Sequence, residues 1–558
     1  MEMDGHQSDD ENDDHYEHDH TEVSTTTKTP NATMSPIPHV MHHEHGKPIL
    51  ETHLLPEERL YWENYNTTTY FNVPTNYRST LYLHIIFALF SIVFIYPITL
   101  IFNNLNMRKS YMLSLVIHSC CIIFSLFNYS IFINSIPELY PGNAYSKMLV
   151  ILFVSTILQL IFAFIKSIDP NTNEYFNLGS SSDDDESRNS LTSTEQEEVK
   201  QYHQMPTGNK FTNKLFEFRQ WVAATRFHKV SKIGFNLLNW GHFFYFLILV
   251  PTGVATFCVY GKGGTVFNLL AHFIKGGVFF AYGILTLARY SGGFSNKGWA
   301  WNHKFIKSSD KTNKWFSIQG TGLCTMEMLE SSLILFYGST NIFLEHLANP
   351  GGEWSPKDLQ HASIAFIFIG CGLCGVLCEI KLNDWRFEQA KQNLTKSNQD
   401  TQSITNDTKI IKASPGFSPN PFPILTIFWT GILMSAHEQA SPLSTDIHKQ
   451  WGQMFVLGCA FRFLTYLLML LSSTTCQDLT KPTRPITELI VAFGLLCGGA
   501  IFMESTDPVV LSFEYYGLTA MFTLNVSLGM VTLFMSWVMS VFALKDWLKN
   551  KYARKEMV

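Results

Sequence analysis

The chain has little charge for its length. Of its 558 residues only 15% are Asp, Glu, Lys or Arg, whereas soluble domains carry roughly 25%. Hydrophobic residues make up 46%, and Phe alone occurs 45 times. A soluble globular domain is therefore excluded as the main architecture. We expect an integral membrane protein of the endomembrane system or plasma membrane.

Several sequence signatures of catalysis are also missing. The chain has no phosphate-binding loop ending in Lys-Ser or Lys-Thr and no G-x-S-x-G nucleophile turn. Its basic segments flank apolar runs, so they do not require a nucleic-acid partner. We expect no catalytic residue, and the sequence leans away from an enzyme. The ten cysteines lie in or beside apolar runs, which makes a disulfide framework unexpected.

Residues 1–49 form an acidic tail that is rich in histidine and begins without the basic and apolar pattern of a signal peptide. Such a composition predicts disorder, because few apolar residues are available for a core. An alternative is loose capture of Zn, Cu or Ni by imidazole and carboxylate groups. Glycosylation sequons begin at Asn31 and Asn66, so a glycoprotein is expected if this end faces outside.

Long apolar runs occupy most of the remaining chain. Each is continuous and close to the roughly 20 residues that a membrane helix needs, and none shows the alternation of lipid-facing strands. We therefore expect an all-α membrane protein with about eleven transmembrane helices. The expected spans are 80–103, 111–134, 146–168, 234–259, 264–290, 315–341, 357–382, 419–436, 449–473, 484–505 and 511–543.

Lysine and arginine gather in alternate connections between these runs. Basic clusters follow spans one, three, five, seven, nine and eleven, and the other connections carry almost none. Positively charged loops remain on the cytosolic side. The pattern therefore predicts an outside or lumenal N-terminus and a cytosolic C-terminus.

Composition divides the chain further. We expect three spans in an N-terminal membrane domain, 50–168, and eight in a C-terminal membrane domain, 225–545. An acidic, Ser-rich cytosolic linker, 169–224, separates them, and a basic cytosolic tail, 546–558, follows.

Four segments resemble a known family. LPEERLYWENYNTTTYF, with the first three spans, is similar to a domain of unknown function at the head of a fungal membrane family. GEWSPKDLQHASIAFIFIG, NPFPILTIFWTGILMSAHEQASPLSTDIHKQWG and MESTDPVVLSFEYYG resemble the Ytp-type C-terminal membrane domain of yeasts. The resemblance covers about 50–168 and 225–545. It implies a fungal multi-pass membrane protein of undefined activity, and it carries over no catalytic residue.

Four ionisable residues are expected inside the spans. Glu327 and Glu330 are three residues apart and so share a helix face, near the middle of the run that contains them. Lys275 and Arg462, on other spans, are candidates to neutralise them. A charged side chain within a bilayer is retained when it has an oppositely charged partner or a functional role. A static ion-paired lock and a proton relay both satisfy this need.

A second polar set is expected at the outer ends of the spans. Its members are Glu345, His346, His361, His437 and Glu504. Imidazole and carboxylate groups at one level suit Zn²⁺ or another first-row divalent ion. The alternative is that these residues cap helix ends near the headgroups.

Three functions remain open from sequence. The first is a transporter-like protein that binds a proton or a divalent metal ion. The second is a b-type haem oxidoreductase, which needs two imidazoles at one depth; His84, His272, His361 and His437 are the candidates. The third is a structural or adaptor protein. The cofactor is unknown from sequence, with a divalent metal favoured over haem, and the lipid bilayer is the expected partner.

Overall fold

The protein is described here from a computed structural model. It describes residues 46–168, 226–294, 299, 306–307, 324–345, 354, 356–400, 410–412, 419–472 and 484–556. Most of these residues are helical, and nine helices in the described ranges are long and apolar enough to cross a membrane. The expectation of an all-α multi-pass membrane protein is confirmed. The orientation of its two ends stays a prediction.

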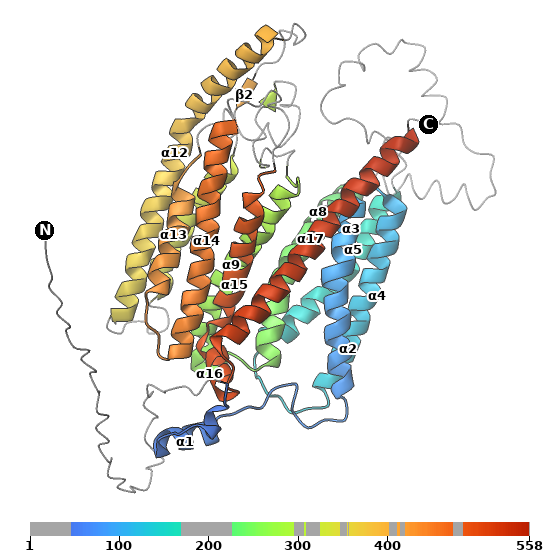
Figure 1. The fold of residues 1–558 in the computed structure, drawn as a ribbon. Coiled ribbons are helices and arrows are strands. Elements are labelled where there is room, and N and C mark those ends of the chain that lie inside the picture. Colours follow the sequence, from blue (N-terminus) through green and yellow to red (C-terminus); the bar gives the residue numbers. More distant parts are fainter. Residues whose placement is uncertain are drawn as a thin grey trace, which may run out of the picture.

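A first bundle is built from the N-terminal half (Figure 1). One rod starts as α2, continues through a π-helical stretch and ends as α3. It packs mainly against α4, while α5 packs mainly against α8. The bounds are α2 (Arg78–Leu89), η2 (Phe90–Ile95), α3 (Tyr96–Asn104), α4 (Arg108–Ile133), α5 (Ala144–Ile168) and α8 (Arg226–Phe257).

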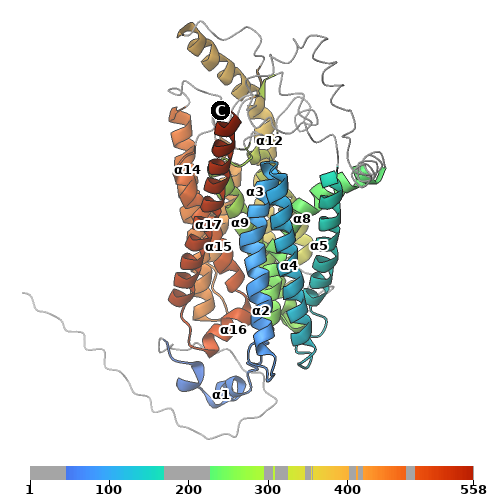
Figure 2. The same ribbon diagram turned by 90° about the vertical axis from the view of Figure 1, so that its right-hand side faces the viewer.

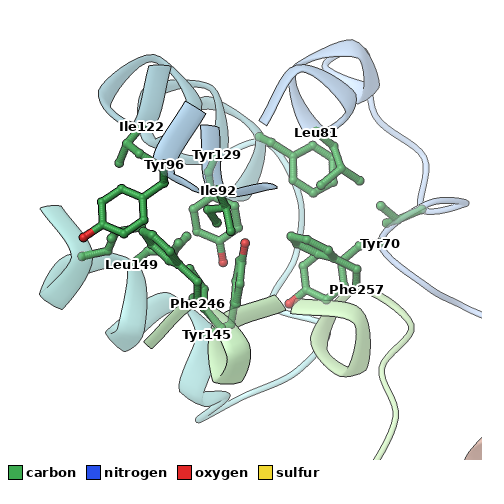
Figure 3. Packing of buried hydrophobic residues seen from close by; sticks show 14 residues of the cluster. Tyr70, Leu81, Ile92, Tyr96, Ile122, Tyr129, Tyr145, Leu149, Phe246 and Phe257 are labelled. Carbon is green, nitrogen blue, oxygen red and sulfur yellow. The ribbon is translucent and has the colours of Figure 1, made fainter. Parts of the chain in front are cut away.

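The core of the first bundle is aromatic (Figure 3). Tyr96 and Phe246 meet edge to face at 5.1 Å between ring centroids, and so do Tyr145 and Phe257. Buried phenols need a hydrogen-bond partner, and Tyr145 has one: its hydroxyl lies 2.9 Å from Nε2 of His84. The first bundle therefore combines apolar packing with polar links between helices.

A second bundle surrounds α15. Helix α15 is the most buried of the nine candidate spans and lies between α9 and α14. Helices α11 and α12 pack together beside α13. They run antiparallel, since Gly338 of α11 lies against Phe368 of α12 while Gly372, farther along α12, lies against Leu335, which is earlier in α11. The bounds are α9 (Val266–Tyr290), α11 (Met326–Glu345), α12 (Pro356–Asp400), α13 (Phe422–Ser435), α14 (Pro442–Ser472) and α15 (Thr487–Glu504).

Two of the eleven expected spans, α11 and α13, are not among the nine helices that are long and apolar enough to cross a membrane. Helix α13 has 14 residues, and α11 carries three glutamates.

Glycine permits the closest contact in the second bundle. A Cβ atom at Gly276 of α9 would lie 2.7 Å from the backbone oxygen of Gly499 of α15, and a Cβ at Gly499 would meet the backbone of Phe280 at 2.6 Å. Side chains larger than hydrogen would push these helices apart. Small residues at membrane helix crossings serve this purpose, and here they fix the position of the polar side chains on α9.

The final helix connects the two bundles. Helix α17 (Ala520–Glu556) packs on α15, α9 and α14 and also reaches α3. Figure 2 shows it running beside both groups. The indole nitrogen of Trp537 donates to the carbonyl of Val93, 2.8 Å away. The expected span 511–543 is divided in the structure, because α16 (Asp507–Tyr515) is a separate short helix before it.

Short elements complete the fold. Helix α1 (Pro56–Glu63) lies near α16 (Figure 1). The rings of Trp62, in α1, and Tyr65, just after it, lie 6.3 and 5.2 Å from that of Tyr515. The remaining elements are η1 (Ile49–Glu51), η5 (Gly263–Thr265) and an antiparallel strand pair, β1 (Ile306–Lys307) and β2 (Ile410–Lys412).

Candidate functional site

A cluster of buried charges lies where α9, α11, α14 and α15 meet. Its centre is Oε1 of Glu330, which accepts a 2.6 Å hydrogen bond from the Tyr282 hydroxyl. The same oxygen lies 3.6 Å from Nη1 of Arg289 and 3.9 Å from Nη1 of Arg462. None of the three charged side chains is more than 6% exposed. One carboxylate therefore links three helices.

A second carboxylate balances the cluster. Nε of Arg462 lies 2.9 Å from Oε1 of Glu488, whose side chain is fully buried in the first turn of α15. With Glu330 and Arg289, the cluster holds two carboxylates and two guanidiniums, so its formal charges cancel. Burying charge is tolerable when it is paired in this way, and the site is compatible with a membrane interior.

The cluster is not fully hydrogen-bonded. Among the described residues, Oε2 of Glu330 and Oε2 of Glu488 have no hydrogen-bond partner. A small cavity adjoins Glu330, and it is lined by Tyr282, Glu330 and Arg462 together with apolar residues such as Ile424. About 20 Å³ of it admits the centre of a water molecule, and roughly 10–15 Å³ suffices for one water. The site therefore has room for water beside a carboxylate.

Local hydrogen bonds hold the start of α11 against this cluster. Nε of Arg289 donates to the carbonyl of Trp299 at 2.7 Å, and the Trp299 indole donates to the carbonyl of Cys324 at 2.9 Å. The next residue, Thr325, donates from its hydroxyl to Glu379 on α12 at 2.7 Å. Its hydroxyl also accepts from the backbone N–H of Met328, 3.1 Å away, as in a helix cap.

The four predicted intramembrane residues take different places. Glu330 and Arg462 lie together, and Glu327 is buried on the same helix. Lys275 is half-buried on α9, seven residues from Tyr282, which is about 10 Å of helix rise. The expectation that both glutamates lie near mid-span needs correction, because α11 begins at Met326 and places them in its first two turns.

Sequence reasoning missed three members of the cluster. Arg289 lies in the last turn of α9, next to the basic segment that follows the expected span five. Glu488 stands at the start of an apolar helix, and Tyr282 has no charge to mark it. An acid in the first turn of an otherwise apolar run was the available signal for Glu488.

The predicted outer metal set is only partly described. The side chain of Glu345 and all of His346 lie outside the described residues. His361 and His437 are half-buried, and Glu504 accepts a 2.7 Å hydrogen bond from Ser527. Among the residues that the structure describes, no three His, Cys, Asp or Glu side chains converge to hold a metal ion. The five-residue site stays a prediction.

Two histidines in the first bundle, His84 and His242, have hydrogen-bond partners at both ring nitrogens. Both ring nitrogens of His84 have partners, Ser125 and Tyr145. Those of His242 have Gln159 and Ser155. An imidazole with both nitrogens occupied is not available to iron. Nothing in this geometry favours His84 as a haem ligand.

Comparisons with known proteins identify the family. The family model "Protein YTP1-like, C-terminal" matches residues 245–546. The "Uncharacterized membrane protein YCR061W" of Saccharomyces cerevisiae is 39% identical, and the match covers 93% of this chain and 91% of that protein. This chain belongs to the YTP1-like family. The predicted family resemblance is confirmed.

Other YTP1-like relatives cover less of the chain. The "Uncharacterized membrane protein C3B8.06" of Schizosaccharomyces pombe is 37% identical over 54% of this chain and 56% of its own length. "Protein YTP1" of S. cerevisiae is 23% identical over 33% of this chain and 31% of its own. A "Domain of unknown function (DUF2427)" model matches residues 64–169. No solved structure matches. The chain is thus a multi-pass integral membrane protein of this fungal family.

Proposed function

We propose that the second bundle is a transporter-like unit in which Glu330 takes up and releases a proton. The observation that carries the proposal is the position of this carboxylate. It contacts groups from α9 and α14, lines a cavity that admits water, and has one oxygen without a hydrogen-bond partner among the described residues. Ionisable groups within membrane helices commonly serve ion or proton movement.

Glu330 is a better proton carrier than Glu488. Glu488 is fully buried, lies 2.9 Å from the Arg462 guanidinium and is not part of the cavity wall. Glu330 lies farther from its two arginines, 3.6 and 3.9 Å away, and reaches the cavity. A proton arriving through cavity water meets Glu330 first.

Protonation of Glu330 would alter the contacts between helices. The carboxyl group would lose its negative charge, and its attraction to the Arg289 guanidinium, 3.6 Å away, would weaken. Arg462 would keep Glu488. The ion pairs of α11 with α9 and α14 would weaken while the pair between α14 and α15 persists. A change in helix packing that follows protonation is what links proton uptake to transport.

A metal cation suits this cluster poorly. Two guanidiniums lie within 4 Å of Glu330, and they would repel a divalent ion in a low-dielectric site. Proton exchange therefore suits this carboxylate better than metal binding.

The competing function is a static lock in a structural or adaptor protein. Removing one member of a buried ion pair is strongly destabilising whatever its role. Loss of stability alone therefore does not separate the two functions, and proton movement must be measured directly.

Proteoliposomes provide the test. The full-length protein is reconstituted with a trapped pH dye, and a potassium gradient with valinomycin imposes a membrane potential. We expect wild type to acidify the lumen faster than empty vesicles and Glu330→Gln to lose at least about tenfold of that rate. Asp446→Asn, at an exposed carboxylate on α14, is the matched control and should keep the wild-type rate. Equal rates for wild type and empty vesicles, or for wild type and Glu330→Gln, would refute the proposal.

A further inference from the structure

The rod that runs from α2 to α3 changes its hydrogen-bond pattern where it meets α17. Between Phe90 and Ile95 it is π-helical, and the backbone N–H of Tyr96 bonds to the carbonyl of Ser91, five residues back. Such stretches are rare within α-helices and are frequent at functional sites. This one lies in the first bundle, and none of its residues belongs to the charge cluster of the second bundle.

Pro97 accounts for the irregular stretch. In an α-helix the Val93 carbonyl would accept a hydrogen bond from the N–H of residue 97, but proline has no N–H, and its ring collides with the carbonyl four residues before it. The Val93 carbonyl accepts a 2.8 Å hydrogen bond from the indole N–H of Trp537 on α17. A side chain of another helix therefore provides a donor that the rod itself lacks.

The helix that carries Trp537 is seated on the second bundle. Phe534 packs 5.6 Å from Phe280 of α9 between ring centroids, and Met535 is buried in one cluster with residues of α15. Trp537 contacts the rod of the first bundle, where its ring lies 4.9 Å from that of Phe94. This segment of α17 therefore contacts the second bundle and the π-helical stretch within a few residues.

The two ends of the stretch are anchored to different helices. The Ser125 hydroxyl of α4 donates to the His84 carbonyl at 2.8 Å and accepts from Nδ1 of the same residue at 2.8 Å. Ser91 and His118 repeat this pairing with the two helices exchanged. Beyond the stretch, the Tyr96 hydroxyl donates to a backbone carbonyl of α8, 2.6 Å away. A change of twist between these anchors would move α2 relative to α3.

We propose that Phe90–Ile95 is a hinge of the first bundle and that Trp537 holds it in the π-helical form. Conversion to α-helical bonding would direct the Val93 carbonyl along the rod toward residue 97, and the indole would lose its acceptor. A shift of α17 on the second bundle would remove the same hydrogen bond and loosen the hinge. Movement in one bundle would thus reach the other through a single side chain.

Hydrogen–deuterium exchange of the full-length protein in detergent tests the hinge. Peptides from α2 through α3 report on the rod, and peptides from α5 serve as an internal reference. We expect Trp537→Phe, which keeps a ring beside Phe94, to speed exchange in the rod about fivefold, as for the loss of one ordinary hydrogen bond. Exchange in α5 should not change. Trp547→Phe, at an exposed position of the same helix, is the matched control and should behave as wild type.

Pro97→Ala should have the opposite effect. Alanine supplies the N–H of residue 97, so the Val93 carbonyl gains a donor within the rod. We expect exchange in the rod to be slower than in wild type. Adding Trp537→Phe to this variant should then change the exchange by less than about twofold, because the carbonyl no longer depends on α17.

Three results would overturn the proposal. Unchanged exchange in the rod of Trp537→Phe would show that the hydrogen bond does not hold the stretch. Equal acceleration in the rod and in α5 would make Trp537 a static brace whose loss destabilises the whole bundle. An undiminished effect of Trp537→Phe in the Pro97→Ala background would show that the carbonyl does not need α17 because of the proline. If Pro97→Ala elutes as an aggregate, Trp537→Phe and Trp547→Phe decide.

Discussion

Arg462 on α14 and Glu488 on α15 form a 2.9 Å ion pair, and neither side chain is more than 5% exposed. This pair joins the central helix of the second bundle to its neighbour. Nη1 of Arg462 also lies 3.9 Å from Glu330. Arg289, 3.6 Å away, is the second cation beside Glu330. Arg462 therefore contacts both Glu488, which contributes to the stability of the bundle, and Glu330, the proposed proton carrier.

Breaking this pair should destabilise the protein. We expect Arg462→Gln and Glu488→Gln each to lower the free energy of unfolding by about 3–5 kcal/mol, because each removes the group that lies 2.9 Å from a buried charge. The double variant should lose less than the sum of the two. Melting in detergent measures this. Asp446→Asn removes the exposed pair with Lys449 and should change stability by less than about 1 kcal/mol. Single variants that melt with wild type would contradict the pairing.

The contact between the bundles gives a second expectation. Trp537→Phe keeps the ring beside Phe94, 4.9 Å away, but removes the hydrogen bond to Val93. We expect a loss of about 1 kcal/mol in unfolding free energy, measured by the shift of a thermal or denaturant transition. Trp547→Phe, at an exposed position on the same helix, should be neutral. An unchanged Trp537→Phe midpoint would mean that α17 does not hold the first bundle through this residue.

Glu514 on α16 should make stability depend on pH. Burial raises the pKa of this carboxyl above its ordinary value of 4.5, and a hydrogen bond with Ser441 opposes the rise. A raised folded-state pKa means that the folded protein binds the proton more tightly than the unfolded chain. Its contribution to stability is present below the ordinary pKa and is lost as pH rises through the folded pKa.

Melting temperatures between pH 4 and pH 8 test this expectation. Wild type should lose stability relative to Glu514→Gln as the pH rises, because glutamine resembles the neutral carboxyl at every pH. Parallel curves for the two proteins would show that Glu514 has no raised pKa.

Glycosylation tests the predicted orientation. Asn66 is exposed before the first span, and Asn31 lies in the tail. If the N-terminus is outside, one or both carry a glycan, and enzymatic deglycosylation shifts the protein on a gel. The shift should vanish in Asn31→Gln/Asn66→Gln. The sequons at Asn393 and Asn406 should stay unmodified, and a glycan on Asn393 would reverse the orientation of the C-terminal half.

The sequence predicts the helices better than their contacts. Continuous apolar runs place α4, α5 and α9 within a few residues of their bounds, because a membrane span must be both long and apolar. The separate helix α16 was missed, since its apolar residues run on into α17 after a short turn. A break of this kind depends on backbone conformation, which hydropathy does not encode.

The candidate site was predicted only in part for a similar reason. Charge made Glu330 and Arg462 visible as potential partners, and the structure pairs them. Which cations surround a carboxylate depends on how far each helix is displaced along its neighbour. That displacement brings Arg289 to Glu330 and leaves Lys275 farther along α9. The contact between the rings of His272 on α9 and His448 on α14, 5.8 Å apart between centroids, likewise requires knowing that α9 and α14 flank α15.

Infrared difference spectroscopy of the purified protein tests the role of Glu330 most directly. Lowering the pH should produce the carbonyl stretch of a newly protonated, buried carboxyl group, reversibly. We expect this band in wild type and in Asp446→Asn, and we expect it to vanish in Glu330→Gln. A spectrum without such a band, or a band that persists in Glu330→Gln, would contradict proton uptake at Glu330.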